Sequence, residues 1–339
     1  MIESGEALRR WMSGSELSRV EMEALFGRLM DGGVSEVHKA ALLVSLAMKG
    51  ETAEEIAGAA AAMRSRSVRI PHAVERVVDT CGTGGDGRGT FNISTAAAFV
   101  AAAAGASVAK HGNRSVSSRS GSADVLQELG ANLEVTPEEA GRTLHEIGIA
   151  FLFAPKLHPA MREVMPVRRE LAVRTVFNVL GPLTNPAGAR RQVLGVYAPH
   201  LVEILARVLA ELGSEHALVV HGSDGLDEIT VTGPTLAAEV VDGSVRSFEI
   251  DPRSLGLTLA DGSALVGGAP ADNAAALRRL FAGEPGPLAD VVALNAAAAL
   301  WMSGEADDLA SGLERTRAAL REGHAAAKLD QFLAFGVDR

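Results

Sequence analysis

The sequence predicts an α/β fold, with a small all-helical domain followed by a larger α/β domain whose mostly parallel central sheet is flanked by helices. Three observations predict it. The first 70 residues carry only helix signals, strand-like runs alternate with helical stretches after Pro71, and a glycine-rich loop joins the first such strand to a helix. A chain of 339 residues is long enough for two domains. We place them at residues 1–70 and 71–339.

The helical segment marks where its helices begin and end. Capping boxes of the Ser/Thr-x-x-Glu type begin at Ser18 and Thr52, and glycines follow the apolar stretches. The expected helices cover residues 18–31, 35–49 and 52–65. The second of these is apolar on more than one side, so it needs partners on several faces. A subunit interface and an ordinary small helical core explain this pattern equally well.

After Pro71, strands and helices alternate. The expected strands cover residues 74–80, 106–109, 150–153, 192–197, 217–221 and 239–241. The expected helices cover residues 96–104, 123–129 and 200–212. This alternation is typical of a parallel sheet, whose active site gathers at the carboxyl ends of the strands. Loops that follow different strands can therefore meet in space although they lie far apart in the sequence.

The loop after the first strand suits phosphate. Residues 79–95 read Asp-Thr-Cys-Gly-Thr-Gly-Gly-Asp-Gly-Arg-Gly-Thr-Phe-Asn-Ile-Ser-Thr. Glycine lets the backbone approach an anion, and a helix beginning near Asn92 directs free N–H groups and the positive end of its dipole at it. The loop contains Gly-x-Gly-x-x-Gly, but no acidic residue follows about 20 positions on, and no Gly-Lys-Ser/Thr follows. Neither a dinucleotide site nor a Walker loop is expected.

A second segment strengthens the expectation of an anion site. From Gly87 to Ala123 there is no Asp or Glu, although the formal net charge of the chain is −10. Gly, Ser and Asn in this window surround the basic residues Arg88, Lys110, His111, Arg114 and Arg119. A solvated basic face is the alternative. We favour a ligand site, because hydroxyls, amides and open backbone suit phosphate and ribose.

Carboxylates gather after a later expected strand. The segment from Val219 to Glu228 contains three of them, Asp224, Asp227 and Glu228. Carboxylates beside a phosphate site suit Mg²⁺, which binds through one or two protein oxygens, several waters and the phosphates of the substrate. A solvated turn is the alternative. General acid–base catalysis by Asp227 and Glu228 is disfavoured, because adjacent side chains in an extended segment point in different directions.

The composition narrows the class of protein. The apolar runs fall short of the roughly 20 residues that a membrane span needs, and residues 1–30 lack the pattern of a signal peptide. The single cysteine, Cys81, fits a reducing compartment, and we expect it to be a packing residue rather than a nucleophile. A pI near 5.4 disfavours nucleic-acid binding. We therefore expect a cytoplasmic protein with no membrane and no nucleic-acid partner.

Together these segments resemble the anthranilate phosphoribosyltransferase family. The resemblance runs nearly end to end, in the order and spacing of the family. It rests on Gly82-Thr-Gly-Gly-Asp86 with Thr90-Phe-Asn-Ile-Ser-Thr95, Lys110-His-Gly-Asn-Arg-Ser115 through Ser122-Ala-Asp124, Arg168-x-x-Leu171 with Arg174-Thr-Val-Phe-Asn-x-Leu-Gly-Pro-Leu-Thr-Asn-Pro186, and Asp227-Glu228. Ala172 stands where relatives usually have Gly, and the arginines on either side of it remain.

The resemblance implies a Mg²⁺-dependent transfer of 5-phosphoribose from phosphoribosyl pyrophosphate to the amine of anthranilate. The products would be N-(5-phosphoribosyl)anthranilate and pyrophosphate, in the second step of tryptophan biosynthesis from chorismate. It also implies a homodimer joined through the helical domain, to which residues 165–190 contribute. Because pyrophosphate leaves while the ribose gains oxocarbenium character, most of the work is leaving-group stabilisation and in-line positioning. No covalent nucleophile is required.

The resemblance also implies roles for individual residues. Lys110 would stabilise the leaving group, and Arg168 would bind the carboxylate of anthranilate, with Gly82 and Asn113 beside this substrate. The expected Mg²⁺ ligands are Ser94, Asp227 and Glu228. The expected contacts of phosphoribosyl pyrophosphate are Gly82, Gly85, Asp86, Thr90, Asn92, Ile93, Ser94, Thr95, Lys110, His111, Gly112, Asn113, Arg114, Ser115, Val116, Ser117, Ser118 and Ser122.

Alternatives remain open for the function and for two residues. A nucleoside phosphorylase of the same fold would leave the Arg168 segment unexplained, and a non-enzymatic nucleic-acid-binding relative would be expected to lose the acids and gain a basic face. Without the resemblance, Arg168 is interpreted as forming a surface ion pair with Glu163 or Glu170. We expect His111 to position a substrate rather than accept a proton, because arylamines are already nucleophilic when neutral.

Overall fold

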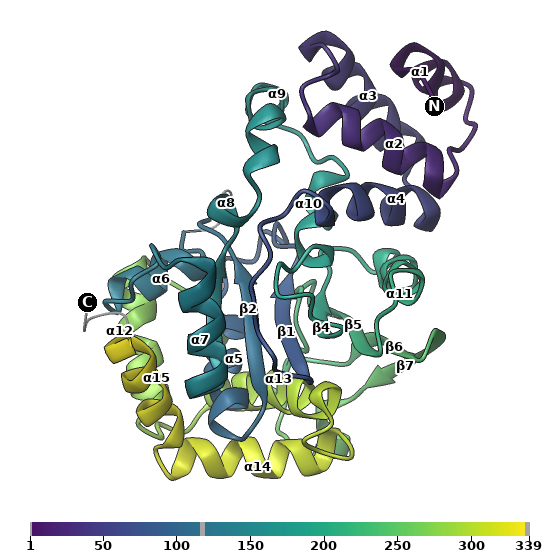
Figure 1. Cartoon of the computed structure of the whole chain (residues 1–339). Coiled ribbons are helices and arrows are strands. Elements are labelled where there is room, and N and C mark those ends of the chain that lie inside the picture. The colour runs from purple at the N-terminus through teal and green to yellow at the C-terminus, as the bar shows by residue number, and fades with distance from the viewer. Residues whose placement is uncertain (1, 116–118, 336–339) are drawn as a thin grey trace.

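The computed structural model describes residues 2–115 and 119–335. Three expected phosphate contacts, Val116, Ser117 and Ser118, lie outside the described residues. In the described parts of the chain, a helical bundle stands above a seven-stranded sheet that is covered by helices on both faces (Figure 1). The fold class expected from the sequence is confirmed.

Four helices form the bundle. They are α1 (Ser4–Met12), α2 (Arg19–Met30), α3 (Glu36–Lys49) and α4 (Ala53–Arg64). The last three match the expected helices, and the capping boxes at Ser18 and Thr52 are both formed. The prediction missed α1, because its N-cap residue, Glu3, makes no side-chain capping bond that a sequence motif could reveal.

The bundle is built around a buried carboxylate. Glu55 of α4 is fully buried and accepts hydrogen bonds from four residues of the surrounding helices and loops. The donors are the indole Nε1 of Trp11 (2.8 Å), the backbone N–H of Leu17 (3.1 Å), the Nζ of Lys49 (2.8 Å) and the backbone N–H of Thr52 (3.0 Å). Burial alone would raise the pKa of Glu55, but these donors outweigh it and hold the pKa below its ordinary value. The carboxylate thereby joins α1, α3 and α4.

The strand order in the sheet is β3-β2-β1-β4-β5-β6-β7. All neighbouring pairs from β3 to β5 are parallel, and β6 and β7 are antiparallel. The strands are β1 (Val77–Gly82), β2 (Ser107–Gly112), β3 (Ile149–Phe153), β4 (Arg191–Gly195), β5 (His216–Gly222), β6 (Thr235–Val241) and β7 (Ser244–Ile250). The prediction missed β7, because this edge strand is mostly exposed and lacks a clear apolar alternation.

Helices cover both faces of the sheet (Figure 1). One face packs against α5 (Ile93–Ala103) and α13 (Pro287–Ser303), and the other against α7 (Pro137–Ile147) and α11 (Leu201–Glu211). The remaining helices are α6 (Ser122–Glu128), α8 (Ala154–Leu157), α9 (Met165–Leu171), α10 (Phe177–Leu180), α12 (Pro270–Phe281), α14 (Leu309–Arg321) and α15 (His324–Phe335). Short 3-10 helices cover Pro159–Glu163, Gly181–Leu183, Pro252–Leu255 and Gly262–Leu265.

The segment that carries α9 and α10 extends from the α/β part towards the helical bundle (Figure 1). The ring of Phe177 in α10 lies 5.6 Å from that of Phe26 in α2. Lys39 of α3 donates from Nζ to the backbone carbonyl of Glu163, at 2.5 Å. One continuous apolar core therefore joins the bundle, this segment and the α11 face of the sheet.

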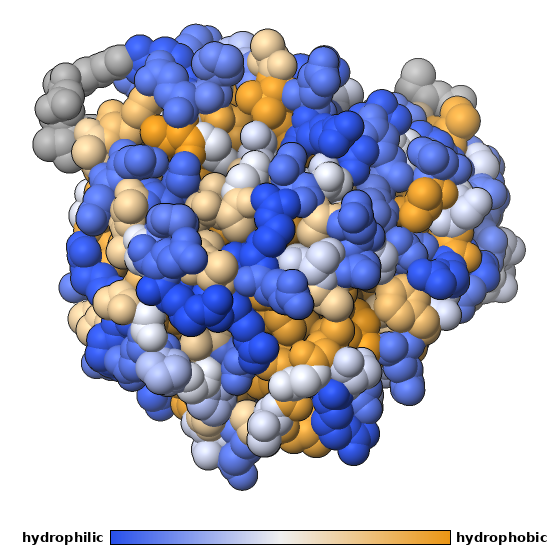
Figure 2. All heavy atoms as spheres, turned by 90° about the horizontal axis from the view of Figure 1, so that it is seen from below, coloured by the Kyte–Doolittle hydropathy of each residue, from blue (hydrophilic) through white to orange (hydrophobic). Residues whose placement is uncertain are grey.

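The surface at the end of the molecule that carries α14 is largely hydrophilic, with small apolar patches between the polar groups (Figure 2). Among residues 2–115 and 119–335, no helix is both long enough and apolar enough to cross a lipid bilayer.

Candidate active site

The carboxyl ends of β1 and β4 lie where the strand order reverses. From β1 the chain continues outwards to β2 and β3, and then returns to the other side of β1 to form β4. The crevice at such a reversal is the usual ligand site of an open α/β sheet. The glycine-rich loop leaves β1 at this point, and the basic segment leaves the neighbouring β2. The two candidate phosphate-binding segments are therefore adjacent.

The acidic segment Asp227–Glu228 passes directly over the carboxyl ends of β1 and β4. A Cβ atom on Gly195 would lie 1.5 Å from the carbonyl oxygen of Asp227, and one on Gly82 would lie 2.3 Å from its Oδ2. Only glycine at both strand ends leaves room for this segment. On its far side, Asn295 of α13 accepts from the backbone N–H of Ile229 at 3.0 Å and donates to its carbonyl at 2.8 Å.

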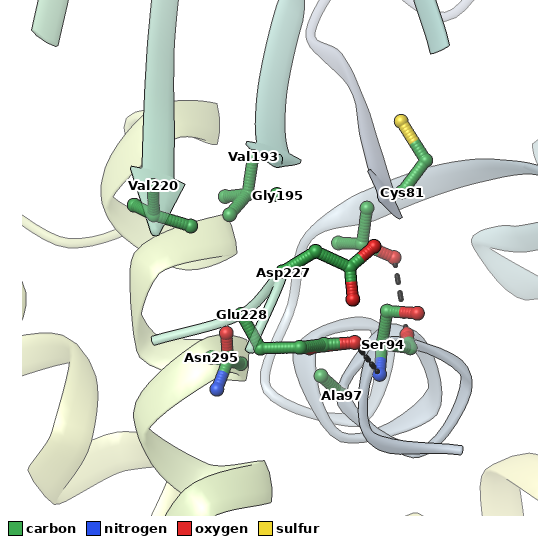
Figure 3. A pocket seen from close by; sticks show the side chains of 10 residues that line it. Cys81, Ser94, Ala97, Val193, Gly195, Val220, Asp227, Glu228 and Asn295 are labelled. Carbon is green, nitrogen blue, oxygen red and sulfur yellow. Dashed lines mark hydrogen bonds between the residues drawn. The ribbon is translucent and has the colours of Figure 1, made fainter. Parts of the chain in front are cut away.

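The two acidic side chains point towards the first turn of α5 (Figure 3). Glu228 accepts from the backbone N–H of Ser94 at 3.2 Å, and Asp227 accepts from the backbone N–H of Gly84 at 2.7 Å. The structure thus brings together the three residues expected to bind Mg²⁺. The third carboxylate of this region, Asp224, lies apart, because it accepts from the hydroxyls of two threonines that follow it in the chain.

The electrostatics of the pair favour a bound cation. Burial raises the pKa of Asp227 to about 6 and that of Glu228 well above its ordinary value, and each carboxylate is further disfavoured by acidic neighbours. The oxygen donors of these side chains and of Ser94 are of the type that Mg²⁺ prefers. Among the described residues, no group of three or more His, Cys, Asp or Glu could hold a metal by itself. A pair of carboxylates fits Mg²⁺, which takes its other ligands from water and substrate phosphates.

Lys110 lies at the floor of the same site. Its side chain, on the α5 face of β2, is 3% exposed. Nζ donates to the backbone carbonyl of Thr80 and, at 3.2 Å, to Oγ of Ser94. Burial lowers the pKa of Lys110, while the nearby carboxylates of Asp79 and Glu228 act in the opposite direction. This buried ammonium lies among the acids and beside the start of α5.

The glycine-rich loop adopts a conformation that few other residues tolerate. Gly84, Gly85, Gly87 and Gly89 all have φ between 62° and 74°, in the left-handed region. Asp86 lies at the centre of the loop. Its Oδ1 accepts from the backbone N–H of Arg88 at 3.1 Å, and its buried Oδ2 has no hydrogen-bond partner among residues 2–115 and 119–335.

The loop leads into α5 through the expected contact residues. Thr90 pairs with Val266 in an isolated bridge, and Asn92 is the N-cap of α5. Ile93 is buried in the first turn, where the hydroxyl of the buried Thr95 has no partner among the described residues. The first turn of α5 therefore contains an unpartnered hydroxyl at Thr95, while the backbone N–H groups of Ile93 and Ser94 already donate to the carbonyl of Phe91 and to Glu228.

The basic segment after β2 is closed by Asp124. Its Oδ2 accepts from the backbone N–H groups of Ser115 (3.0 Å) and Gly121 (2.9 Å). The Oδ1 atom forms an ion pair with Arg114 at 3.0 Å. Arg114, an expected phosphate contact, is thus already paired with a carboxylate of the protein. Ser122 begins α6 directly after this closed loop.

His111 points to the opposite face of the sheet from Lys110, as successive residues of a strand do. Its Nδ1 lies 3.1 Å from the carbonyl of Gly181, and its Nε2 lies 3.2 Å from Nε2 of His158. Burial lowers the pKa of His111 to about 3 and that of His158 to about 4, so both rings are neutral at pH 7. The backbone N–H of His111 is held by Asp79 at 3.1 Å.

Arg168 makes none of the ion pairs that we considered for it. Its guanidinium lies over the ring of Phe177, 5.3 Å from the centroid, and Glu163 pairs with Arg162 instead. Among the described residues, no carboxylate pairs with Arg168, and no hydrogen bond joins it to Asp227 or Glu228. Burial lowers its pKa. This half-buried cation is therefore available to an anionic ligand.

Two further expected residues are placed as follows. Asn113 is exposed directly after β2 and accepts from the backbone N–H of Arg114 at 2.7 Å. Cys81 is buried beneath the loop, where the amide of Gln192 donates to its Sγ at 3.0 Å. Burial and the neighbouring Asp79 raise the pKa of the Cys81 thiol well above its ordinary value. A packing role fits this cysteine, because the nucleophilic thiolate is disfavoured.

Several residues that shape the site escaped the sequence-based prediction, because none of them belongs to a local motif. Asn295, Gly195 and His158 each act through a contact with a residue that is distant in the chain. Arg174, in contrast, belongs to a motif that carries the resemblance but was given no role; its guanidinium donates to the carbonyl of Gly85 and so connects the α9–α10 segment to the glycine-rich loop.

Comparisons with known proteins agree with this architecture. Residues 5–67 match the helical bundle domain of a glycosyl transferase family, and residues 74–326 match its a/b domain. The chain is 51% identical to the anthranilate phosphoribosyltransferase of Laribacter hongkongensis over 98% of both chains. The crystal structure of the Thermus thermophilus enzyme of that name has a TM-score of 0.92 and 47% identity, covering 97% of this chain and 98% of the other.

The Saccharomyces cerevisiae enzyme is a more distant relative. Its structure in complex with phosphoribosyl pyrophosphate and Mg has a TM-score of 0.89 and 27% identity, covering 98% of this chain and 97% of the other. The helical bundle and the α/β domain thus define the chain as a member of a glycosyl transferase family. Within that class, the chain belongs to the anthranilate phosphoribosyltransferase family.

Proposed function

We propose that this chain transfers 5-phosphoribose from phosphoribosyl pyrophosphate to the amine of anthranilate, with Mg²⁺ as cofactor. The observation that carries the proposal is the convergence of Asp227, Glu228 and Lys110 on the first turn of α5. A buried cation, a pair of acids and a helix N-terminus together suit a metal-bound pyrophosphate. The membership of the family supports the same activity.

The donor would bind in the crevice between β1 and β4. The glycine-rich loop and the start of α5 would donate N–H groups to its pyrophosphate, and Ser94, Asp227 and Glu228 would hold Mg²⁺. When bound, Mg²⁺ offsets the charge of the acids and of the pyrophosphate. Lys110 would stabilise the charge that develops on the leaving group, from a position that its hydrogen bonds already fix.

The acceptor would be held by its carboxylate. The half-buried guanidinium of Arg168 has no protein carboxylate as a partner among the described residues, and its planar donors match a carboxylate with two parallel hydrogen bonds. Gly82 and Asn113 would lie beside the acceptor. The neutral amine would attack carbon 1 of the ribose as pyrophosphate leaves, and the charged nitrogen that results would release its extra proton to water. The neutral His111–His158 pair would shape the site rather than take a proton.

We also propose that the enzyme is a homodimer joined through the helical bundle, and that it acts in the cytoplasm. Val37 and Met48 of α3 are 78% and 83% exposed, and their spacing of 11 residues places them on one face of the helix. Such apolar side chains support an interface on α3. Light scattering on the purified chain should give a mass of about twice 35.1 kDa; a monomer at micromolar concentration would remove this part of the proposal.

The activity can be tested by following the loss of anthranilate fluorescence. The purified protein would be incubated with phosphoribosyl pyrophosphate and Mg²⁺, and the assay repeated with EDTA. We expect a metal-dependent loss of fluorescence. A flat signal from protein that still binds the donor would mean that the acceptor is wrong, and phosphorolysis of nucleosides would then be assayed with the same preparation.

A further inference from the structure

A buried asparagine of a distant helix holds the N-cap of α5. Asn273 of α12 is 2% exposed. Its Nδ2 donates to Oδ1 of Asn92 at 2.8 Å, and its Oδ1 accepts from the backbone N–H of Gly268 at 2.7 Å. Asn92 in turn donates from Nδ2 to the backbone carbonyl of Ser120 at 3.0 Å. The chain of hydrogen bonds joins three segments that are far apart in the sequence.

The backbone groups at the two ends of this series of hydrogen bonds, the N–H of Gly268 and the carbonyl of Ser120, determine which way each amide faces. A backbone N–H can only donate, so the atom of Asn273 that meets Gly268 must be its oxygen. Its NH₂ group then faces Asn92, whose facing atom must be the acceptor oxygen. A backbone carbonyl can only accept, so the NH₂ group of Asn92 must face Ser120. All three bonds agree on one orientation, and reversing either amide would place like groups together.

The orientation decides what Asn92 offers to a ligand. Its NH₂ group has a second N–H, for which no partner is found among the described residues, whereas its oxygen is already bonded to Asn273. Asn92 is the N-cap of α5, at the end of the glycine-rich loop and two residues before Ser94. It therefore presents a donor to an anion. The reversed amide would present an oxygen, which repels phosphate.

We propose that Asn273 is a positioning residue for the phosphoribosyl donor. It acts through Asn92, by fixing the amide so that an N–H faces the donor site, and through the bond to Ser120 it also holds the basic segment against α5. The proposal rests on the proposed function, because it assumes that an anionic phosphoribosyl donor binds at the start of α5. Asn273 itself touches no substrate.

The test uses a double-mutant cycle in the whole enzyme. Calorimetry would measure the binding of phosphoribosyl pyrophosphate with Mg²⁺, without anthranilate, for wild type, Asn92→Ala, Asn273→Ala and the double variant. We expect each single variant to weaken donor binding by about tenfold, the loss of one hydrogen bond to a charged group. Because Asn273 acts through Asn92, the double variant should bind no more weakly than Asn92→Ala.

A second variant separates orientation from packing. Asn273→Asp keeps the size of the side chain and the acceptor for Gly268, but places a carboxylate oxygen against Oδ1 of Asn92, which favours the reversed amide. It should weaken donor binding at least as much as Asn273→Ala and leave the KM for anthranilate within about twofold. The matched control is Asp272→Asn on the same turn, an exposed residue that caps Ala269 and lies outside the network. Its donor binding should equal that of wild type.

The outcomes distinguish this proposal from the proposed function. If wild type binds no phosphoribosyl pyrophosphate, the proposed function fails. If wild type binds it and the losses of Asn92→Ala and Asn273→Ala add in the double variant, Asn273 acts independently of Asn92 and the positioning role is wrong. Wild-type affinity in Asn273→Asp would also overturn it. Thermal unfolding of each variant checks that the protein is folded, and Asn273→Ala serves if Asn273→Asp does not fold.

Discussion

Removing the guanidinium of Arg168 should weaken the use of anthranilate far more than the use of the donor. Hydrogen bonds to a charged group contribute roughly 1.5–3 kcal/mol, and each 1.4 kcal/mol is about tenfold in affinity. Arg168→Ala should therefore raise the KM for anthranilate by about 10-fold to 100-fold. The lost stacking on Phe177 is worth about 0.5–2 kcal/mol of folding stability, so the variant should remain folded.

The assay is anthranilate fluorescence at saturating phosphoribosyl pyrophosphate and Mg²⁺, followed by the reverse titration of the donor at saturating anthranilate. Two further variants give the controls. Arg168→Lys keeps the charge but lacks the planar pair of donors, so its KM for anthranilate should fall between those of wild type and Arg168→Ala. Arg169→Ala removes an exposed neighbour and should behave as wild type.

The reasoning depends on a difference between the two substrates. Arg168 would be removed from the site if the KM for anthranilate in Arg168→Ala stayed within about twofold of wild type. An equal rise in the KM values of both substrates would also contradict it, because that result points to a general disturbance of the α9–α10 segment. Urea unfolding of the same preparation separates the second outcome from simple loss of stability.

Two more predictions concern the fold around the site. In Gly195→Ala the new Cβ would meet the carbonyl of Asp227, so the segment Asp227–Glu228 must move. Turnover should therefore fall by about 100-fold. The control is Gly262→Ala, whose new Cβ lies in open space and which should retain wild-type turnover. Glu55→Gln leaves the buried ammonium of Lys49 unpaired and should cost about 3–5 kcal/mol in urea unfolding at pH 7. Because the pKa of Glu55 is held below its ordinary value, its contribution to stability is present above about pH 4.3 and lost as the pH falls through the lower folded-state pKa. The difference between wild type and Glu55→Gln should therefore shrink at acid pH, and a constant difference would contradict this account.

Local signals were sufficient for α2, α3 and α4 of the bundle and for most strands. Capping boxes and glycine stops act within one turn of helix, so the sequence near Ser18 and Thr52 predicts where α2 and α4 begin. The same reasoning could not find α13, although it lies at the centre of the core. Its Ala-, Leu- and Val-rich residues are buried on nearly every side, so no one-sided apolar pattern marks it as a helix.

The proximity of the segments that form the candidate site could also be predicted from local signals. The glycine-rich loop, Lys110 and the pair Asp227 and Glu228 each follow a strand, so the rule that strand ends meet at one edge of a parallel sheet is enough to bring them together. Asn273 and Asn295 lie within helices, so no local sequence pattern places them at the site. An asparagine within a helix has the same local sequence appearance whether it faces solvent or closes a buried network, and only the tertiary contacts distinguish the two.

The chemistry of the amide explains why asparagine serves at both of these positions. An amide donates and accepts at once, so Asn295 satisfies both the N–H and the carbonyl of Ile229, and Asn273 joins a backbone donor to a side-chain acceptor. It does so without adding charge to a crevice that already holds the buried groups of Lys110 and the acidic pair. A carboxylate of the same size would lack the donor and would add a buried negative charge beside a site for pyrophosphate. In the proposed donor site, α12 and α13 would therefore hold Asn92 and the Asp227–Glu228 segment in place without adding charge of their own.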